Sequence, residues 1–545
     1  MRRTGPITQA TTTTLITTLT FVLVFLSSFI KILDYDIWFH LESGEYIIAN
    51  LSIPATDPFS YTAYGNPWIT HEWLSGVVFY LVWLAAGFSG LTFFKTTIIT
   101  AVFAVSFLSL REKGIATFIA LSIIALSALI AKERYIERPE LFTYLFTAIF
   151  IYILETRKGL LYLPLLSALW ANMHSGVVFG LAIAGLYTAA ALSKDILPAL
   201  KARRASFSML SKDSKKLAGA FFLSLCAALI NPNTYMVYTY PFTALDISSG
   251  SGLDIAEYSP PTFAADTLFF TALFLFTLVF ALNIKKARAE HVLIFILFSI
   301  LALKFNRSIA LWAIIASFLA PIYLDMSLKR KPRTALAVLI ALIIVSSTLV
   351  PHIVRMAKTG FLGAGILEGR FPEGAVRFLE REDIKGNMYN SYELGGYLIW
   401  RTYPERKVYI DGRSDIYRGL LDEQRVLSAL GFENIIEKYD INYAIMSYSP
   451  SNTEYISPNP IFGGMLALVW WDDTAMIYLK RTADNMPIIE KLEYKFIRPT
   501  DTGLIFTDTS QPHALIADIE RNIRETGPGE RNLLLLKKIN ERIGN

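Results

Sequence analysis

Apolar segments of membrane-spanning length recur between residues 12 and 354 and constrain the fold more than any other feature. A helix needs about 20 apolar residues to cross the hydrocarbon core of a bilayer. Segments of this kind, several of them shorter, lie at 12–33, 89–110, 115–131, 140–155, 160–172, 175–193, 217–231, 263–283, 290–304, 309–325 and 334–354. The sequence therefore predicts a polytopic α-helical membrane domain with about eleven transmembrane helices.

Basic residues in the connecting loops set the expected orientation. The clearest basic loops are 194–216, 285–288 and 329–333, and weaker ones are 111–113 and 157–158. All five fall on the side of the N-terminus if the apolar stretch Trp73–Gly87 is a non-spanning helix, and all five flip outward if it crosses the membrane. Because cytoplasmic loops are enriched in Lys and Arg, we expect a cell-membrane protein with a cytoplasmic N-terminus and an extracytoplasmic C-terminal domain.

Composition argues against several classes of site. The net charge is +5 and no basic tract of the kind that binds nucleic acid is present, so no nucleic-acid partner is expected. The single cysteine, Cys226, permits no intrachain disulfide and no thiolate metal site. It lies in an apolar segment, and we expect it to be a packed, inert thiol.

After about Gly360 the hydropathy falls and the pattern becomes that of a mixed α/β domain. Short strands are expected at 387–391, 407–411, 441–447 and 475–480, with helices at 393–401 and 513–543, the last interrupted by Gly527–Gly529, and a hairpin at Trp470–Asp473. We expect residues 356–545 to form this outer domain and residues 1–355 to form the transmembrane domain, including a long first outer loop at 34–88.

Two motifs in the expected outer domain stand out: Tyr392–Tyr397 and Asp411–Asp415. One interpretation is that they roof the active-site cavity and touch the sugar or the acceptor. In the other, the glycine pair of the first motif permits close approach to another backbone, and the Asp-Gly pair of the second forms a turn after a strand.

The first outer loop opens with Asp34-Tyr35-Asp36-Ile37-Trp38-Phe39-His40-Leu41 and ends near His71-Glu72-Trp73-Leu74. Two carboxylates directly after a span are costly to place at the membrane interface without a partner. Residues 37–50 are expected to form a helix that lies in the interface.

The order Asp-x-Asp-x-Trp-Phe-His-Leu, Ile-Pro, Asp-Pro-Phe-Ser, Pro-Trp and His-Glu-Trp-Leu resembles a prokaryotic group of the GT-C glycosyltransferase superfamily. That superfamily includes oligosaccharyltransferase catalytic subunits, protein O-mannosyltransferases and aminoarabinose transferases. Its members carry a catalytic Asp in the first outer loop, immediately after the first span. The resemblance implies a GT-C-like transmembrane domain with Asp36 as the catalytic residue and Asp34 as the second choice.

The resemblance is not complete. The second outer loop, Lys132–Glu140, departs from the Asp-rich form of oligosaccharyltransferases, so their metal site does not carry over. A Trp-Trp-Asp acceptor-peptide motif is also missing from the place where those enzymes have it. Protein N-glycosylation is therefore not implied.

The implied activity is inverting transfer of a sugar from a polyprenyl-phosphate donor, within membrane lipid, to an unidentified glycan, lipid or protein acceptor. An acceptor hydroxyl that attacks the anomeric carbon needs a general base, and a carboxylate meets that need. The departing phosphate needs cations, for which the Arg guanidinium is well shaped. Arg134, Arg138 and Arg307 lie on the expected side for this role.

Each candidate residue also has a structural alternative. Asp36 is either the base or an interfacial helix cap, and Asp34 is either its partner or a cap. His40, His71 and His174 either share a divalent cation such as Mg²⁺ or Mn²⁺ with Asp36 or Glu72, or are hydrogen-bonded structural histidines. The sequence makes no cofactor certain.

The remaining expected substrate-binding residues are Trp38, Glu72, Glu137 and Asn172. Glu137 either contributes to donor-phosphate binding with Arg138 or forms an internal ion pair with it. Asn172 and His174 are expected to line a cavity where two short spans meet outside.

Two other classes of function stay open. A transporter or flippase of lipid-linked saccharides should show an internal repeat or ionisable groups near the bilayer midplane. The sequence shows no convincing repeat, and its polar groups cluster at one interface. A non-catalytic membrane assembly protein would keep the same motifs for packing alone.

Overall fold

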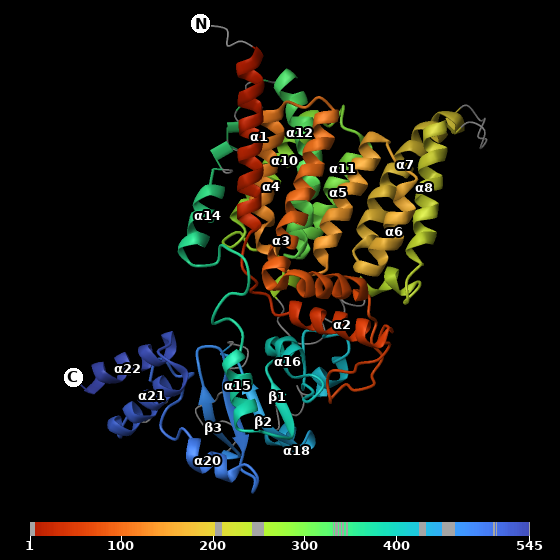
Figure 1. Cartoon of the computed structure of the whole chain (residues 1–545). Helices are drawn as coiled ribbons and strands as arrows, with labels where there is room; N and C mark the ends of the chain where they lie inside the picture. The colour runs from red at the N-terminus through yellow and green to blue at the C-terminus, as the bar shows by residue number, and fades with distance from the viewer. Residues whose placement is uncertain are drawn as a thin grey trace. The chain divides into compact units, whose positions relative to one another are not determined.

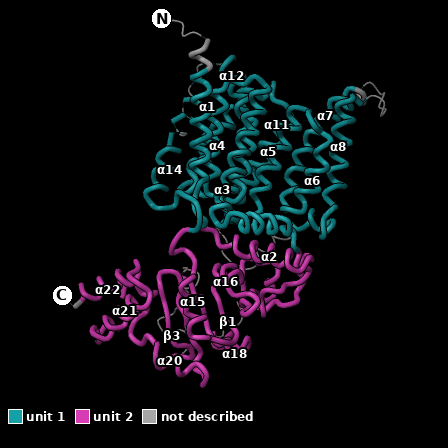
Figure 2. The backbone as a smooth tube through the Cα atoms, in the orientation of Figure 1, with its two compact units in different colours: residues 1–32, 70–249, 253–366 teal, residues 33–69, 250–252, 367–545 magenta. Residues whose placement is uncertain are grey.

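The computed structural model describes residues 6–201, 210–241, 256–330, 347–423, 432–448, 464–504 and 509–543, with single positions between 331 and 346 and at 507. The chain forms two compact units (Figure 2), of which the first comprises 1–32, 70–249 and 253–366. Residues 33–69 and 367–545 make up the second. The predicted span 334–354, the basic loop 194–216 and the outer loop 231–262 fall partly outside the described residues.

The first unit is helical (Figure 1). Its helices are α1 (Pro6–Ser28), α3 (Trp73–Glu112), α4 (Thr117–Ala131), α5 (Glu140–Thr156), α6 (Tyr162–Met173), α7 (Val177–Lys201), α8 (Lys212–Ala228), α10 (Thr267–Asn283), α11 (Ala289–Lys304), α12 (Ser308–Arg330) and α14 (Leu349–Lys358), with 3₁₀ turns η1 (Lys132–Arg134) and η3 (Ala256–Tyr258). Helix α12 is central and packs against α3, α4, α10 and α11. The expected helices are therefore present at the expected places within the described residues.

Four of these helices are long and apolar enough to cross a membrane: Thr11–Ser28, Trp73–Glu112, Val177–Pro198 and Ser308–Arg330. Several others, such as α6, are shorter than an ideal span. The membrane character of the unit agrees with the prediction, whereas the number of about eleven spans stays a prediction. Cys226 on α8 is exposed, so the expectation that it is packed is wrong.

Helix α3 is two helices joined at Gly87. This glycine has φ 61° and ψ −161°, a conformation that residues with a Cβ rarely adopt. The break separates Trp73–Ala86 from the apolar segment that follows, as the orientation argument requires. Whether the first part crosses the membrane stays a prediction.

Inside the helical unit, the end of the first span pairs through its backbone with residues 361–366. The N–H of Lys31 donates to the carbonyl of Phe361 at 2.9 Å, and the N–H of Ile32 donates to Gly365 at 2.8 Å. Lys95 on α3 donates to the carbonyl of Ile30 at 2.8 Å. The chain thus leaves the helical unit on two neighbouring strands of backbone, one leading to Asp34 and the other to the C-terminal segment.

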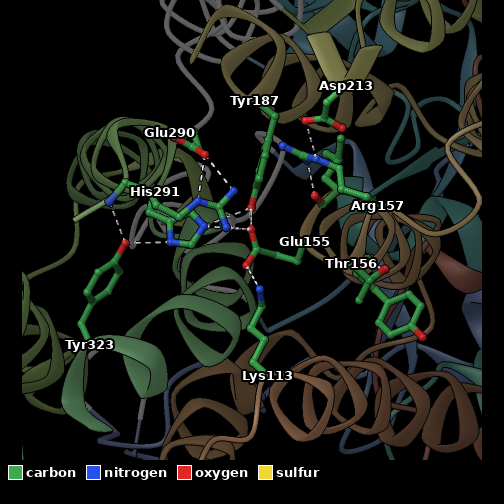
Figure 3. Close-up of polar contacts among 12 residues, drawn as sticks. Lys113, Glu155, Thr156, Arg157, Tyr187, Asp213, Glu290, His291 and Tyr323 are labelled. Carbon is green, nitrogen blue, oxygen red and sulfur yellow. Dashed lines mark hydrogen bonds and ion pairs between the residues drawn. The ribbon is translucent and has the colours of Figure 1, made fainter. Parts of the chain in front are cut away.

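Three of the predicted basic loops meet in one cluster of the helical unit (Figure 3). Glu155 Oε1 accepts hydrogen bonds from Tyr187 Oη at 2.5 Å, His291 Nε2 at 2.9 Å and Arg288 Nη1 at 2.9 Å. Lys113 Nζ lies 2.6 Å from Glu155 Oε2. Loops that the sequence assigns to one side of the membrane therefore lie together, and the buried carboxylate of Glu155 is paired with their cations.

The second unit contains a four-stranded sheet in the order β1-β2-β4-β3. Its strands are β1 (Asn387–Asn390), β2 (Ile441–Met446), β3 (Leu466–Trp471) and β4 (Met476–Lys480), parallel only between β1 and β2. Its helices are α2 (Ile37–Asn50), α15 (Glu373–Arg381), α16 (Gly395–Thr402), α18 (Glu433–Lys438), α20 (Met486–Leu492), α21 (Pro512–Thr526) and α22 (Glu530–Ile543), and η4 spans Tyr392–Leu394. The hairpin at Trp470–Asp473 is present, because β3 and β4 are antiparallel neighbours there.

The predicted strand 407–411 is wrong. Within it Val408 forms only an isolated bridge, and its partner is Ser60 of the first outer loop. The main chain of Tyr409 and Ile410 is bound instead by the side chain of Asn390, at 2.8 and 2.7 Å. A side chain replaces the strand ladder here, which a hydropathy pattern does not reveal.

The first outer loop folds with the C-terminal segment rather than with the helical unit where we expected it. Tyr61 donates its N–H to Val408 at 3.1 Å and its hydroxyl to Met388 at 2.8 Å. Arg413 Nη1 lies 2.8 Å from Asp57 Oδ1. These long-range contacts, all inside the second unit, are why residues 33–69 separate from the helices on either side of them in sequence.

We expect Glu155→Ala to lower the stability of the helical unit by about 1–3 kcal/mol, because it leaves the buried Tyr187 hydroxyl and His291 ring without their acceptor and removes the anion beside the partly exposed Lys113 and Arg288. Thermal unfolding of the purified protein in detergent measures this. Glu112→Ala is the control, since Glu112 pairs with the 69%-exposed Lys158 and such surface pairs contribute little. Equal unfolding midpoints for Glu155→Ala and the wild type would contradict the assignment.

Candidate functional site

The predicted site residues are divided between the two units. Asp34, Asp36, Trp38 and His40 lie in the second, whereas His71, Glu72, Arg134, Glu137, Arg138, Asn172, His174 and Arg307 lie in the first.

Asp36 occupies the residue before α2, where a side-chain cap would be expected. Its backbone is helical, with φ −79° and ψ −22°, and its carboxylate makes no capping hydrogen bond to the helix. Asp34 is buried, and its Oδ2 accepts the N–H of Asp36 at 3.3 Å. The turn is thus ordered by Asp34, and the carboxylate of Asp36 is not used to cap α2.

Trp38 and His40 are packed inside the second unit. The Trp38 ring makes edge contacts with Phe371 and Tyr397, at 4.8 and 4.7 Å between centroids. His40 is buried, and its ring lies 4.1 Å from that of Phe39. These contacts fix the orientation of α2, and therefore of Asp36 at its start.

In the helical unit, the three predicted arginines belong to one ionic network. Arg134 in η1 contacts Glu140 at 2.6 Å and Glu257 of η3 at 2.5 Å. Arg138 contacts Glu257 at 3.2 Å, and Arg307 contacts Glu140 at 3.5 Å. Three guanidinium groups therefore share two carboxylates, which leaves this group of five side chains with one excess positive charge.

Sequence reasoning missed Glu257 and Tyr258 as members of this network. Burial raises the pKa of Glu257, but the three nearby arginines outweigh it and hold the pKa at about 2. The hydroxyl oxygen of Tyr258 accepts a hydrogen bond from Arg307 Nη1 at 2.7 Å. The only sequence signal was an acidic residue beside a tyrosine in a predicted outer loop.

Glu137 pairs with a residue that the sequence did not suggest. Its Oε1 lies 2.7 Å from Lys95 Nζ, and both side chains are 1% exposed. Since Lys95 also holds the carbonyl of Ile30, this pair connects the second predicted outer loop to the end of the first span. Glu137 thus forms a buried ion pair with Lys95, whereas the internal pair expected from the sequence was with Arg138.

His71, Glu72 and His174 form a second polar group of the helical unit. His174 Nδ1 accepts the N–H of Gly176 at 3.0 Å, so its proton is on Nε2, which lies 3.4 Å from Glu72 Oε1. Burial lowers the pKa of His174 to about 4, against the opposing effect of Glu72, so the ring is neutral at pH 7. His71 Nε2 also lies 3.4 Å from Glu72.

This arrangement does not fit a divalent cation. A metal would need an unprotonated ring nitrogen, and the one that His174 offers accepts a hydrogen bond. In the part of the chain that the structure describes, no group of three or more His, Cys, Asp or Glu could hold a metal ion. We therefore derive no step through a metal.

Asn172 connects helices. Its Oδ1 accepts from Trp73 Nε1 at 2.9 Å, and its Nδ2 donates to the carbonyls of Ala168 at 2.8 Å and Ile230 at 2.7 Å. These bonds join α6 to the start of α3 and to the chain after α8. They position the neighbouring His174 and give Asn172 itself a structural role.

Glu42 on α2 was also missed. It is buried on the same helix as Trp38 and Leu41, where an apolar residue would be expected. Burial, together with the nearby Glu45, raises the pKa of Glu42 to about 8. At neutral pH this carboxyl is therefore mostly protonated.

No family model matches this chain, and no curated protein does. Among solved structures, the oligosaccharyltransferase of Archaeoglobus fulgidus gives a TM-score of 0.52 at 12% identity, over 91% of this chain and 78% of that chain. ArnT from Cupriavidus metallidurans in the apo state gives 0.51 at 11% identity, over 86% and 98%. ArnT bound to undecaprenyl phosphate gives 0.42 at 12% identity, over 86% and 98%, which is too low to argue from.

The neighbours are GT-C glycosyltransferases, and the resemblance seen in the sequence is confirmed at the level of fold. At these identities the likeness does not extend to residues or substrates. Function must be argued from the site.

We expect Glu42→Gln to change how stability depends on pH. Between about pH 4.5 and 8 the folded state holds a proton on Glu42 that the unfolded state has lost, so the free energy of unfolding falls as the pH rises. Glutamine removes this dependence. The unfolding midpoint of the variant should exceed that of the wild type increasingly from pH 5 to pH 8.5, and parallel curves would contradict the assignment.

Proposed function

We propose that this chain is an inverting glycosyltransferase that moves a sugar from a polyprenyl-phosphate donor to an acceptor hydroxyl outside the cytoplasm. The GT-C fold supports the class of reaction, and the place of Asp36 directly before α2, in a turn ordered by Asp34 and with a carboxylate that does not cap the helix, is the observation that carries the proposal. We also propose that the N-terminus is cytoplasmic and the second unit extracytoplasmic.

Asp36 is the proposed general base. As the acceptor oxygen attacks the anomeric carbon, its proton passes to the carboxylate while the bond from carbon to the phosphate oxygen breaks. Displacement from the opposite face inverts the anomeric centre. Asp34 is proposed to position Asp36, because its carboxylate accepts the N–H of Asp36 and so orders the backbone turn before α2.

The arginine network is proposed to bind the donor phosphate. Its five charged side chains carry one excess positive charge, which suits a phosphodiester with a single negative charge. Within this network Arg138 contacts Glu257 at 3.2 Å, whereas Arg134 contacts Glu140 and Glu257 at 2.6 and 2.5 Å. The Arg138 side chain is 23% exposed and that of Arg134 is 12% exposed, so Arg138 is more open to a ligand oxygen than Arg134 is.

We expect Asp36→Asn to lower kcat by about 10²–10⁴-fold with little change in donor affinity, because the amide cannot accept the proton. Sugar transfer by the purified protein, assayed with a panel of short-chain polyprenyl-phosphate sugars, measures this. Asp383→Asn, on an exposed turn of the second unit, is the matched control.

The assay also separates the classes of function. Equal turnover by Asp36→Asn and the wild type would remove Asp36 from the mechanism. An absence of transfer with every donor would favour the transporter or the assembly protein instead.

We expect Arg138→Gln to raise the donor KM by about 10–100-fold, the equivalent of one charge-assisted hydrogen bond, with a smaller effect on kcat. Arg138→Lys should recover part of the loss, because it keeps the charge without the planar fork. Arg381→Gln, on an exposed helix, is the control. An unchanged KM would argue against phosphate binding by this network.

A further inference from the structure

The Asp411–Asp415 motif lies against the start of α2, inside the second unit. A Cβ atom added to Gly412 would lie 2.6 Å from Asp36 Oδ1 and 3.4 Å from Asp36 Cγ. Real Cβ atoms do not approach an oxygen so closely. The missing side chain of Gly412 therefore leaves the space that the Asp36 carboxylate occupies.

The backbone of Gly412 is fixed from several sides and has little freedom to yield. Its carbonyl accepts hydrogen bonds from Tyr392 Oη and from the N–H of Ser414, each at 3.0 Å. The preceding residue, Asp411, is fully buried and accepts from Arg413 Nη2 at 2.6 Å and from Tyr417 Oη at 2.5 Å.

Arg413 fixes the other side of this turn. Its Nη1 lies 2.8 Å from Asp57 Oδ1, and its guanidinium lies 4.5 Å from the centre of the Trp68 ring. A planar, charged group held by two carboxylates and an aromatic ring has one orientation available. The turn is therefore part of a rigid frame that also includes the first outer loop.

The backbone before α2 is confined as well. A Cβ at Gly396 would lie 2.8 Å from the carbonyl oxygen of Tyr35, so α16 lies directly against this turn. The hydroxyl of Tyr35 donates to the carbonyl of Arg370 at 2.8 Å. With the backbone restrained on both sides of the contact, a Cβ at Gly412 would have to displace the Asp36 carboxylate.

We propose that Gly412 is a positioning residue for Asp36: the absence of a side chain there sets the rotamer in which the carboxylate meets the acceptor. This rests on the proposed function, in which Asp36 is the base. It differs from both sequence-based interpretations of the motif, which made it a contact for sugar or acceptor or a simple turn. General-base catalysis tolerates displacements of only a fraction of an ångström, so a rotated carboxylate costs rate rather than binding.

The test is Gly412→Ala in the full-length protein, with Gly419→Ala as the matched control. Gly412 is outside the left-handed region, so alanine introduces no backbone strain there. A Cβ at Gly419, in the same unit, would meet nothing within 4 Å. Both substitutions add one methyl group, but only the first meets the carboxylate.

We expect Gly412→Ala to lower kcat by about 10–100-fold with the donor KM within about twofold and a near-normal unfolding midpoint. In the Asp36→Asn background it should cause no further loss, because it acts through that carboxylate. Carbodiimide labelling of Asp36, followed by mass spectrometry, should change in Gly412→Ala and not in Gly419→Ala.

Three results would overturn the proposal. They are wild-type kcat and labelling in Gly412→Ala, an equal further loss in the Asp36→Asn background, and failure of Gly412→Ala to fold, which would show that the backbone yields instead. Failure of the proposed function has a different signature, since Asp36→Asn would then turn over like the wild type. In that case, carbodiimide labelling of Asp36 in Gly412→Ala and Gly419→Ala still tests whether Gly412 sets the position of the Asp36 carboxylate.

Discussion

The short backbone pairing between residues 30–32 and 361–366 is the constraint on which the end of the first span depends. It fixes the last residues of that span against the segment that precedes the C-terminal part of the chain, inside the helical unit. Asp34 and Asp36 follow within a few residues in the sequence. Lys95 strengthens the anchor, because it binds Ile30 and Glu137 at once.

Paired charges set the internal order of the helical unit. One cluster is centred on Glu155, where one carboxylate receives donors from three other helices or loops. The other contains the arginines, where cations outnumber carboxylates. Buried polar groups of this kind stabilise only when every partner is present. The first cluster suits a structural role, whereas the second contains three guanidinium groups around two carboxylates.

Much of the fold follows from the hydrophobic periodicity of the sequence and from its turn-forming and helix-breaking residues. The helix at 37–50, the hairpin at Trp470–Asp473 and the break before Glu530 are all found where local chemistry predicts them. The strand expected at 407–411 is absent because Asn390 takes over its hydrogen bonds, and this depends on tertiary contacts. The same limit applies to Glu257 and Lys95, whose partners lie far away in sequence.

The candidate site shows a similar division. The motif order drew attention to Asp36 and to the arginines, because carboxylates and cations near a membrane face are chemically unusual. It did not reveal that Asn172 joins helices or that His174 is neutral, since both depend on hydrogen bonds to distant or main-chain atoms. The close approach to another backbone that the glycine pair at 395–396 permits is confirmed, since Gly395 lies against the carbonyl of Ile410 and Gly396 against that of Tyr35.

The contact between the first outer loop and the C-terminal segment has a consequence for biogenesis. Tyr35 and its partner Arg370 are 335 residues apart, with nearly all of the helical unit between them. Chains are made from the N-terminus, and a domain folds as a unit once its parts are available. The segment around Asp36 therefore lacks its contacts with the C-terminal part of its unit while the intervening helices are synthesised and inserted. A chain released before about residue 370 would lack the segment against which residues 33–69 pack, so this part of the second unit can fold only after nearly the whole chain has been made.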